Sequence, residues 1–418
     1  MTQTSAPPRA GLLVSCAERE AIIWRRVDDL LATADVDGVL ANKLGPVAAR
    51  RLHEQGRPVP AALENEARLA RAAWMSSIML LSRIRSVCEG PLLLIKGPEV
   101  AALYPGRARA FMDVDILSPQ AESVHAALRA NGFIEVDDPE LFTHHHHLRP
   151  LQWPALWLKV EIHQRPMWPR GLTPPSVDEI VAAAVPSATG VPGLSAPDPA
   201  GHALILAGHA WVHEPLDTLR DLIDVAAVAA RADPARLTAL ARAWGIERIW
   251  RTTSGAANGL VGDGALTRAV QLWGRHLPAV KERTVLGNHL ARSLNSFWAL
   301  PLRPALRAAA RALRFDLFPY DDESWREKLI RVGYAFARPS ASRSSHTQAW
   351  RAAAQGRQEE SFPVPQRRRL GGPIGGRPDP APGQRGAQPL DLPDDVGRGQ
   401  GEQPHVGKGA ERENHHEP

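Results

Sequence analysis

The segment Phe111–Leu117 limits the fold of this chain more than any other, because carboxylate and apolar side chains alternate along it. Asp113 and Asp115 alternate with Val114 and Ile116. Successive side chains of a β-strand point to opposite faces, so the two aspartates share one face, with Cα atoms roughly 6.6–6.8 Å apart. Two carboxylates on one face repel each other unless a cation lies between them. We therefore predict a strand with one face in the core and the other facing a ligand.

A short apolar run and a glycine turn precede this strand. Leu92–Ile95 predicts a buried strand that ends at Lys96-Gly97. Gly97 permits a tight turn and lets a ligand approach the backbone closely. Pro98 suits the first position of a helix, which we expect over residues 99–104. The free amides at the start of that helix would face an anion placed over the turn.

A later segment, Leu158–His163, predicts a third strand with the same alternation. Its polar side chains are Lys159, Glu161 and His163. If this strand lies beside Phe111–Leu117, Glu161 joins the two aspartates in a cluster of three carboxylates. Such a cluster can hold one or two metal ions. Oxygen ligands beside a phosphate group favour Mg²⁺ or Mn²⁺.

Taken together, these motifs resemble the polymerase-beta-type nucleotidyltransferase superfamily, whose pattern is a glycine turn, then Asp-x-Asp, then a third acidic residue on a later strand. More narrowly, the chain is similar to an uncharacterised bacterial nucleotidyltransferase family, over roughly residues 60–330. The shared motifs are Lys96-Gly97, Tyr104-Pro105, Arg109, Asp113, Asp115, Glu161-Ile162-His163 and Leu219–Asp224.

The resemblance implies a metal-dependent transfer of a nucleoside monophosphate from a nucleoside triphosphate, with ATP expected, to an acceptor that is a small molecule, a peptide or a protein. It assigns catalysis and the binding of Mg²⁺ or Mn²⁺ to Asp113, Asp115 and Glu161. The expected nucleotide-binding residues are Lys96, Gly97, Arg109 and His163. The expected residues on the acceptor side are His209, Arg220 and Asp224.

Several alternatives stay open at this point. Much of the superfamily has Gly-Ser or Gly-Gly at the turn, whereas this chain has Gly97-Pro98. That departure favours a second hypothesis, a catalytically inactive nucleotide-binding or scaffold protein on the same fold. Arg109 could pair with Glu99 instead of binding substrate. Asp224 could belong to a salt-linked helix.

A run of four histidines, His144–His147, suggests another metal-binding hypothesis. In a strand, neighbouring side chains face opposite ways, so at most two of the four serve one ion. We keep two interpretations of the run: a polar strand near the active site, and the zinc site of a histidine-rich metal hydrolase.

The order of the predicted elements indicates an α+β fold with a small mixed sheet. We expect an N-terminal helical segment (1–90), a nucleotidyltransferase-like α/β core (91–185), a C-terminal helical domain (200–338) and a disordered tail rich in proline, glycine and arginine (339–418). The tail contains few large apolar side chains, so it cannot bury enough surface to offset chain entropy.

Composition limits the partners and the compartment. The net charge of +5 is too small to indicate a polyanionic partner, so we do not expect nucleic acid. The most apolar stretch, residues 72–84, is too short to span a bilayer, and we expect no membrane segment. The two cysteines, Cys16 and Cys88, have no metal-like spacing and form no disulfide framework, which favours the cytoplasm.

Overall fold

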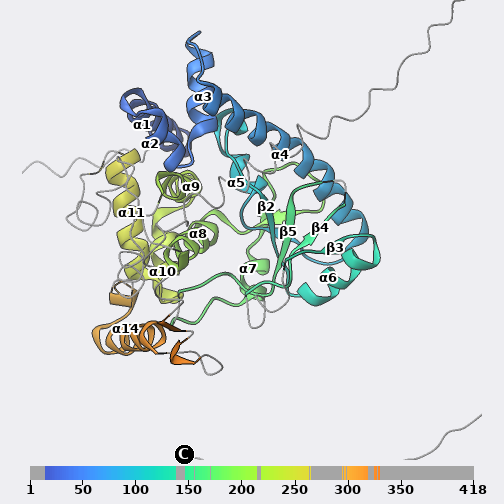
Figure 1. Cartoon of the computed structure of the whole chain (residues 1–418), viewed down its shortest axis with the longest axis vertical. Coiled ribbons are helices and arrows are strands. Elements are labelled where there is room, and N and C mark those ends of the chain that lie inside the picture. Colours follow the sequence, from blue (N-terminus) through green and yellow to red (C-terminus); the bar gives the residue numbers. More distant parts are fainter. Residues whose placement is uncertain are drawn as a thin grey trace, which may run out of the picture. The chain divides into compact units, whose positions relative to one another are not determined.

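The computed structural model describes residues 15–137, 146–154, 156–169, 171–213, 218–262, 264, 294, 296–297, 299–318, 324–326 and 328–329. The predicted disordered tail lies outside these ranges, and so do His144 and His145. The predicted α+β fold is confirmed, with a mixed sheet between groups of helices (Figure 1).

The described strands form a seven-stranded sheet in the order β3-β4-β5-β2-β1-β7-β6. Their bounds are β1 Leu93–Leu94, β2 Asp113–Leu117, β3 Ile134–Glu135, β4 Leu151–Gln152, β5 Lys159–His163, β6 Val185–Pro186 and β7 Ser195–Ala196. The pairs β2–β5 and β1–β7 are parallel, and the other neighbours are antiparallel. The two longest strands, β2 and β5, therefore lie side by side in the middle of the sheet.

Helices α4 and α6 cover one face of the sheet. The alternate side chains Val114, Ile116, Val160 and Ile162 are fully buried there, in one cluster with residues of α4 (Ala61–Val87) and α6 (Ala121–Ala130). Burial of each such side chain contributes about 1.5–3 kcal/mol. The apolar half of the predicted alternation thus fixes which face of β2 and β5 enters the core, and it leaves the carboxylates on the opposite face.

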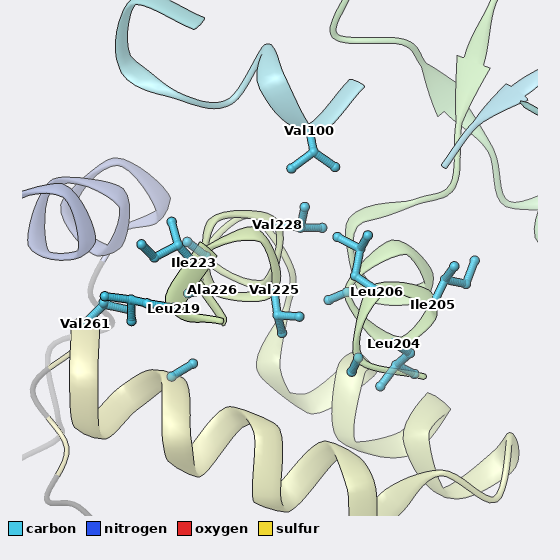
Figure 2. Packing of buried hydrophobic residues seen from close by; sticks show 14 of the residues in the cluster. Val100, Leu204, Ile205, Leu206, Leu219, Ile223, Val225, Ala226, Val228 and Val261 are labelled. Carbon is cyan, nitrogen blue, oxygen red and sulfur yellow. The ribbon is translucent and has the colours of Figure 1, made fainter. Parts of the chain in front are cut away.

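A second group of helices accounts for the rest of the described helical structure. Their bounds are α1 Cys16–Thr33, α2 Val36–Ala41, α3 Gly45–Glu54, α5 Pro98–Ala101, α7 Val177–Ala182, α8 Pro199–His213, α9 Leu219–Ala229, α10 Pro234–Ala243, α11 Glu247–Val261 and α14 Leu302–Leu317. Leu93, Ile95 and Leu117 from the sheet share a cluster with α8 and α9. Val100 of α5 and Val261 of α11 pack in the same cluster (Figure 2). The carboxylates of β2 and β5 therefore lie on the side of the sheet that α8 and α9 occupy.

Helix α8 is apolar on nearly all sides, and residues 200–208 are buried without interruption. A helix with this character needs neighbours all round, which α9, α10 and α11 provide (Figure 1). None of the described helices has the length and apolar character that a bilayer crossing needs.

The helix expected over 99–104 was predicted too long, since it ends at Ala101. Residues 151–152 form β4, which pairs with β5, and residues 195–196 form β7, which pairs with β6. Two-residue strands carry too little periodicity to be recognised in a sequence.

Candidate active site

Strands β2 and β5 bring the predicted carboxylates together. They pair in parallel, with Asp113 opposite Lys159, Asp115 opposite Glu161, and Leu117 opposite His163. Directly opposed residues point to the same face of a sheet. The predicted adjacency of these two strands is thereby confirmed, and Glu161 lies beside the second aspartate of the Asp-x-Asp motif.

A compact group of possible metal ligands forms at this point. One ligand atom from each of Asp115, Glu161 and His163 lies within 4.8 Å of the other two. The His163 Nε2 atom is 3.1 Å from Asp115 Oδ1 and 3.8 Å from Glu161 Oε2. Asp115 is 3% exposed and His163 is 1% exposed. We expected the group to consist of Asp113, Asp115 and Glu161, but among the described residues its third member is His163. Asp113 is half-buried and lies two residues before Asp115, on the same face of β2.

His147 extends the group on the side of Glu161. Its Nδ1–H donates to the carbonyl oxygen of Leu148 (2.7 Å), and its Nε2 is 3.6 Å from Glu161 Oε2. The chain around it runs antiparallel to β5, with a single bridge between His147 and His163. The rings of His146, His147 and His163 have centroids 4.7–5.2 Å apart. This arrangement fits the interpretation of the histidine run as a polar strand near the active site, although the predicted site residues include no member of the run.

The backbone itself requires a glycine at position 97, with or without a bound ligand. Its φ is 58°, in the left-handed region that favours glycine. A Cβ atom at this position would also lie 2.4 Å from the carbonyl oxygen of Asp113. The turn after β1 therefore rests directly on the backbone at the start of β2, and it sets the position of Lys96.

Lys96 links the carboxylates to the helices across from them. Its Nζ is 3.2 Å from His209 Nε2 on α8. Its charge helps to lower the pKa values of Asp115 and of Asp221 on α9. Of the predicted acceptor-side residues, His209 is thus in contact with the site, whereas Arg220 binds Asp221 at 3.2 Å.

Arg109 makes a closed ion pair with Asp224 on α9. Its Nε and Nη2 donate to the two oxygens of Asp224 at 2.8 and 2.6 Å, and the Tyr104 hydroxyl donates to Asp224 Oδ1 at 2.6 Å. Arg109 does not pair with Glu99, whose carboxylate accepts from Ser187 Oγ and the Ala188 amide. Asp224 on α9 is therefore held in a salt link to Arg109.

A comparison with protein families matches residues 24–262 to the family described as uncharacterised nucleotidyltransferase. The match covers more than half of the 418 residues. The chain belongs to this family. Comparisons with curated proteins and with solved structures yield no match. Family membership assigns a general nucleotidyltransferase function and implies a nucleoside triphosphate as substrate.

In this nucleotidyltransferase the two central carboxylates have opposite pKa shifts. Burial alone would raise the pKa of Asp115, but the hydrogen bond from His163 and the nearby charges of Lys96, His163 and His147 lower it to about 2. Burial and the negative charges of Asp115 and Asp113 raise the pKa of Glu161 well above its usual range, against the effect of Lys96 and Lys159. Close carboxylates titrate in this way because both cannot easily be ionised together.

Two buried polar atoms of the site have no hydrogen-bond partner among the described residues: Asp115 Oδ2 and His163 Nδ1. A buried polar atom without a partner costs about 1–3 kcal/mol. A carboxylate oxygen with spare capacity, beside a second carboxylate, fits a divalent cation in both charge and ligand chemistry. The residues present therefore fit the metal ion that a nucleotidyltransferase uses.

Proposed function

We propose that the chain transfers a nucleoside monophosphate from a nucleoside triphosphate, with ATP expected, to a small-molecule, peptide or protein acceptor, with Mg²⁺ or Mn²⁺ as cofactor. One observation carries the proposal. The in-register parallel pairing of β2 with β5 places Asp115 beside Glu161, and a buried Asp115 oxygen there has no hydrogen-bond partner in the part of the chain that the structure describes. The free cysteines Cys16 and Cys88 fit a reaction in the cytoplasm.

The residues of the site have distinct roles in the proposed reaction. Asp115 and Glu161 would hold the metal ion, with Asp113 at the next same-face position of β2. When bound, the ion supplies neutralisation of phosphate charge and activation of the acceptor group. Glu161 accepts the proton of the acceptor hydroxyl or amine as the acceptor atom attacks the α-phosphorus. The new bond to phosphorus forms as the bond to the bridging oxygen breaks, and pyrophosphate leaves.

The nucleotide contacts follow from the surroundings of the two strands. Lys96 neutralises charge that develops on the phosphates, and Gly97 keeps the turn close to β2. His163 keeps Asp115 oriented through its 3.1 Å contact. We assign Arg109 a supporting part in the nucleotide site, because its pair with Asp224 fixes α9. His209 and Arg220 remain the proposed residues on the acceptor side.

We also propose that the functional units follow the predicted division at 1–90, 91–185 and 200–338. In this division the core provides Asp115 and Glu161, while the helical domain provides His209. Strand β7 at Ser195–Ala196 joins the same sheet as β1, which supports extending the core to Ala196.

The direct test is turnover by the full chain. Purified protein is incubated with Mg²⁺ or Mn²⁺ and α-labelled ATP, and both pyrophosphate release and label transfer to candidate acceptors are followed. We expect Asp115→Asn to lower turnover by about 10³-fold or more, because it removes charge stabilisation of the transition state. Asp178→Asn is the matched control, since Asp178 is exposed on α7. Turnover that survives Asp115→Asn would overturn the proposal.

A second candidate function rests on Pro98. Proline has no backbone N–H, so the first residue of α5 cannot donate to a phosphate. This observation favours a nucleotide-binding or scaffold protein without turnover. Saturable ATP binding together with no turnover across a wide set of acceptors would support it over the enzyme.

A further inference from the structure

The possible metal ligands on β2 and β5 include a ring nitrogen. His163 Nε2 lies 3.1 Å from Asp115 Oδ1 and 3.8 Å from Glu161 Oε2. In an octahedral centre with bonds of about 2.1 Å, adjacent ligand atoms are about 3.0 Å apart and opposite ones about 4.2 Å. The 3.1 Å distance matches adjacent ligands, and the 3.8 Å distance lies between the adjacent and opposite values. The ring nitrogen therefore stands where a ligand to the same ion would stand, next to both carboxylates.

The hydrogen bonding of this group is incomplete on two of its three members. Asp115 Oδ2 and His163 Nδ1 are buried and have no partner among the described residues. Both side chains are more than nine-tenths buried. Water and protein groups normally satisfy such atoms. The open Asp115 oxygen therefore has capacity for a bound cation. The contact between His163 and Asp115 is made by Nε2, so the open Nδ1 atom carries no part of the argument for that ion.

His147 has the hydrogen-bonding pattern of a metal-binding histidine. Its Nδ1–H donates to the Leu148 carbonyl at 2.7 Å, which in the neutral ring leaves a lone pair on Nε2. That nitrogen lies 3.6 Å from Glu161 Oε2. Metal-binding histidines commonly donate their other N–H to a backbone carbonyl in this way.

We propose that Asp115, Glu161 and His163 form a mixed oxygen–nitrogen centre that binds a first-row transition-metal ion in preference to Mg²⁺, with His147 beside it. Magnesium binds oxygen ligands and retains several waters, whereas imidazole is a good ligand for later divalent metals. The proposal specifies the metal site of the proposed nucleotidyl transfer. It rests on the proposed function for the catalytic role of the ion, and its claim about metal binding does not depend on that function.

The test uses Mn²⁺ alone as the probe, with the full chain and no nucleotide. Binding removes the six-line electron paramagnetic resonance signal of free Mn²⁺, and pulsed measurements on the bound ion detect coupling to a directly bonded imidazole ¹⁴N. We expect ¹⁴N coupling in the wild-type protein and displacement of Mn²⁺ only by a large excess of Mg²⁺. His163→Gln should weaken Mn²⁺ binding by about tenfold or more and remove the coupling.

The matched control is His125→Gln. His125 is a buried histidine of α6, and its Nε2 contacts the Arg149 carbonyl oxygen at 2.9 Å. This variant should keep both the affinity and the ¹⁴N coupling. Coupling that survives His163→Gln and disappears in His147→Gln would overturn the assignment of His163. Where His163→Gln does not fold, the His147→Gln variant decides the matter: coupling that persists in it supports His163, and coupling that disappears overturns the assignment.

The outcomes separate this proposal from the proposed function. Bound Mn²⁺ without ¹⁴N coupling, or no binding at millimolar Mn²⁺, overturns the mixed centre. Turnover of labelled ATP without ¹⁴N coupling keeps the transferase and leaves His163 as a residue that positions Asp115. Coupling without turnover keeps the mixed centre and contradicts nucleotidyl transfer.

Discussion

The structure contains two buried groups of charged side chains whose hydrogen bonding differs. Around Asp224, both carboxylate oxygens accept from Arg109, and Tyr104 donates as well. Around Asp115, one carboxylate oxygen and one nitrogen of His163 have no partner among the described residues. Buried charges are normally paired, so a complete group needs nothing further, whereas an incomplete one has capacity left for a ligand. We call them the closed cluster (Arg109, Tyr104, Asp224) and the open cluster (Asp115, Glu161, His163).

The largest effect on stability should come from breaking the closed cluster. Arg109→Ala leaves a buried carboxylate unpaired, so we expect the free energy of unfolding to fall by about 3–5 kcal/mol. The double variant Arg109→Met, Asp224→Leu should recover most of this loss, because an apolar pair can replace a buried ion pair. Urea unfolding at neutral pH measures both. A loss below about 1 kcal/mol in the single variant would show that the pair is not structural.

A bound cation should raise the free energy of unfolding through the open cluster, and the closed cluster should contribute nothing to this gain. Mn²⁺ at 100 times its dissociation constant should raise the free energy of unfolding by about 2.7 kcal/mol. Asp115→Asn should abolish this gain. Asp224→Asn should lower the starting stability and keep the gain. The free energy of unfolding is measured with and without Mn²⁺ for the wild type and for both variants. An equal gain in Asp115→Asn would place the ion elsewhere.

Gly97→Ala tests whether the turn supports the open cluster. The added Cβ would lie 2.4 Å from the Asp113 carbonyl oxygen, at a φ of 58°. We expect a loss of about 1–3 kcal/mol for strain of this kind, together with weaker Mn²⁺ binding as β2 shifts. Gly56→Ala is the control, because its φ is 65° and no atom of the described residues lies within 4 Å of the new Cβ. An equal loss of unfolding free energy in the two variants would show that the backbone around Asp113 moves aside for the new Cβ atom without destabilising the protein.

The smallest effect concerns pH. The folded-state pKa of Glu161 lies above the ordinary value of 4.5, so the metal-free folded protein binds more protons than the unfolded chain above that pH. Stability should therefore fall as pH rises through that range, and Glu161→Gln should remove the fall. Asp115 acts in the opposite direction, because its pKa is lowered from 3.8 to about 2, so its contribution is lost as pH falls between those values. Urea unfolding in a chelator from pH 4.5 to 8 measures the Glu161 effect, and a wild-type profile that does not fall would contradict it.

The sequence was sufficient to predict the middle of the sheet. Strict alternation along Phe111–Leu117 and Leu158–His163 predicted β2, β5 and the shared face of their carboxylates. The helical segment predicted over 1–90 contains α4, which spans Ala61–Val87. In these segments a periodic pattern continues over many residues, so local sequence and burial agree.

The remaining parts of the site depend on contacts between distant residues. Arg109 and Asp224 are 115 residues apart, and nothing local to either residue indicates that they pair. The place of His163 in the open cluster depends on the register of β5 against β2, which the alternation alone leaves free. His147 enters through a single bridge to β5. The only indication in the sequence was the run of four histidines before the strand Leu158–His163. That run did not distinguish His147 from the other three histidines.

The strand order has a consequence for the history of such proteins. Strands β2 and β5 each have a neighbour on both sides, while β3 and β6 form the outer borders of the sheet. Loops that join the border strands can lengthen, shorten or change composition without displacing the two inner strands. Proteins with this strand order can therefore evolve to use new acceptors through changes in the outer loops, while the residues on β2 and β5 stay the same.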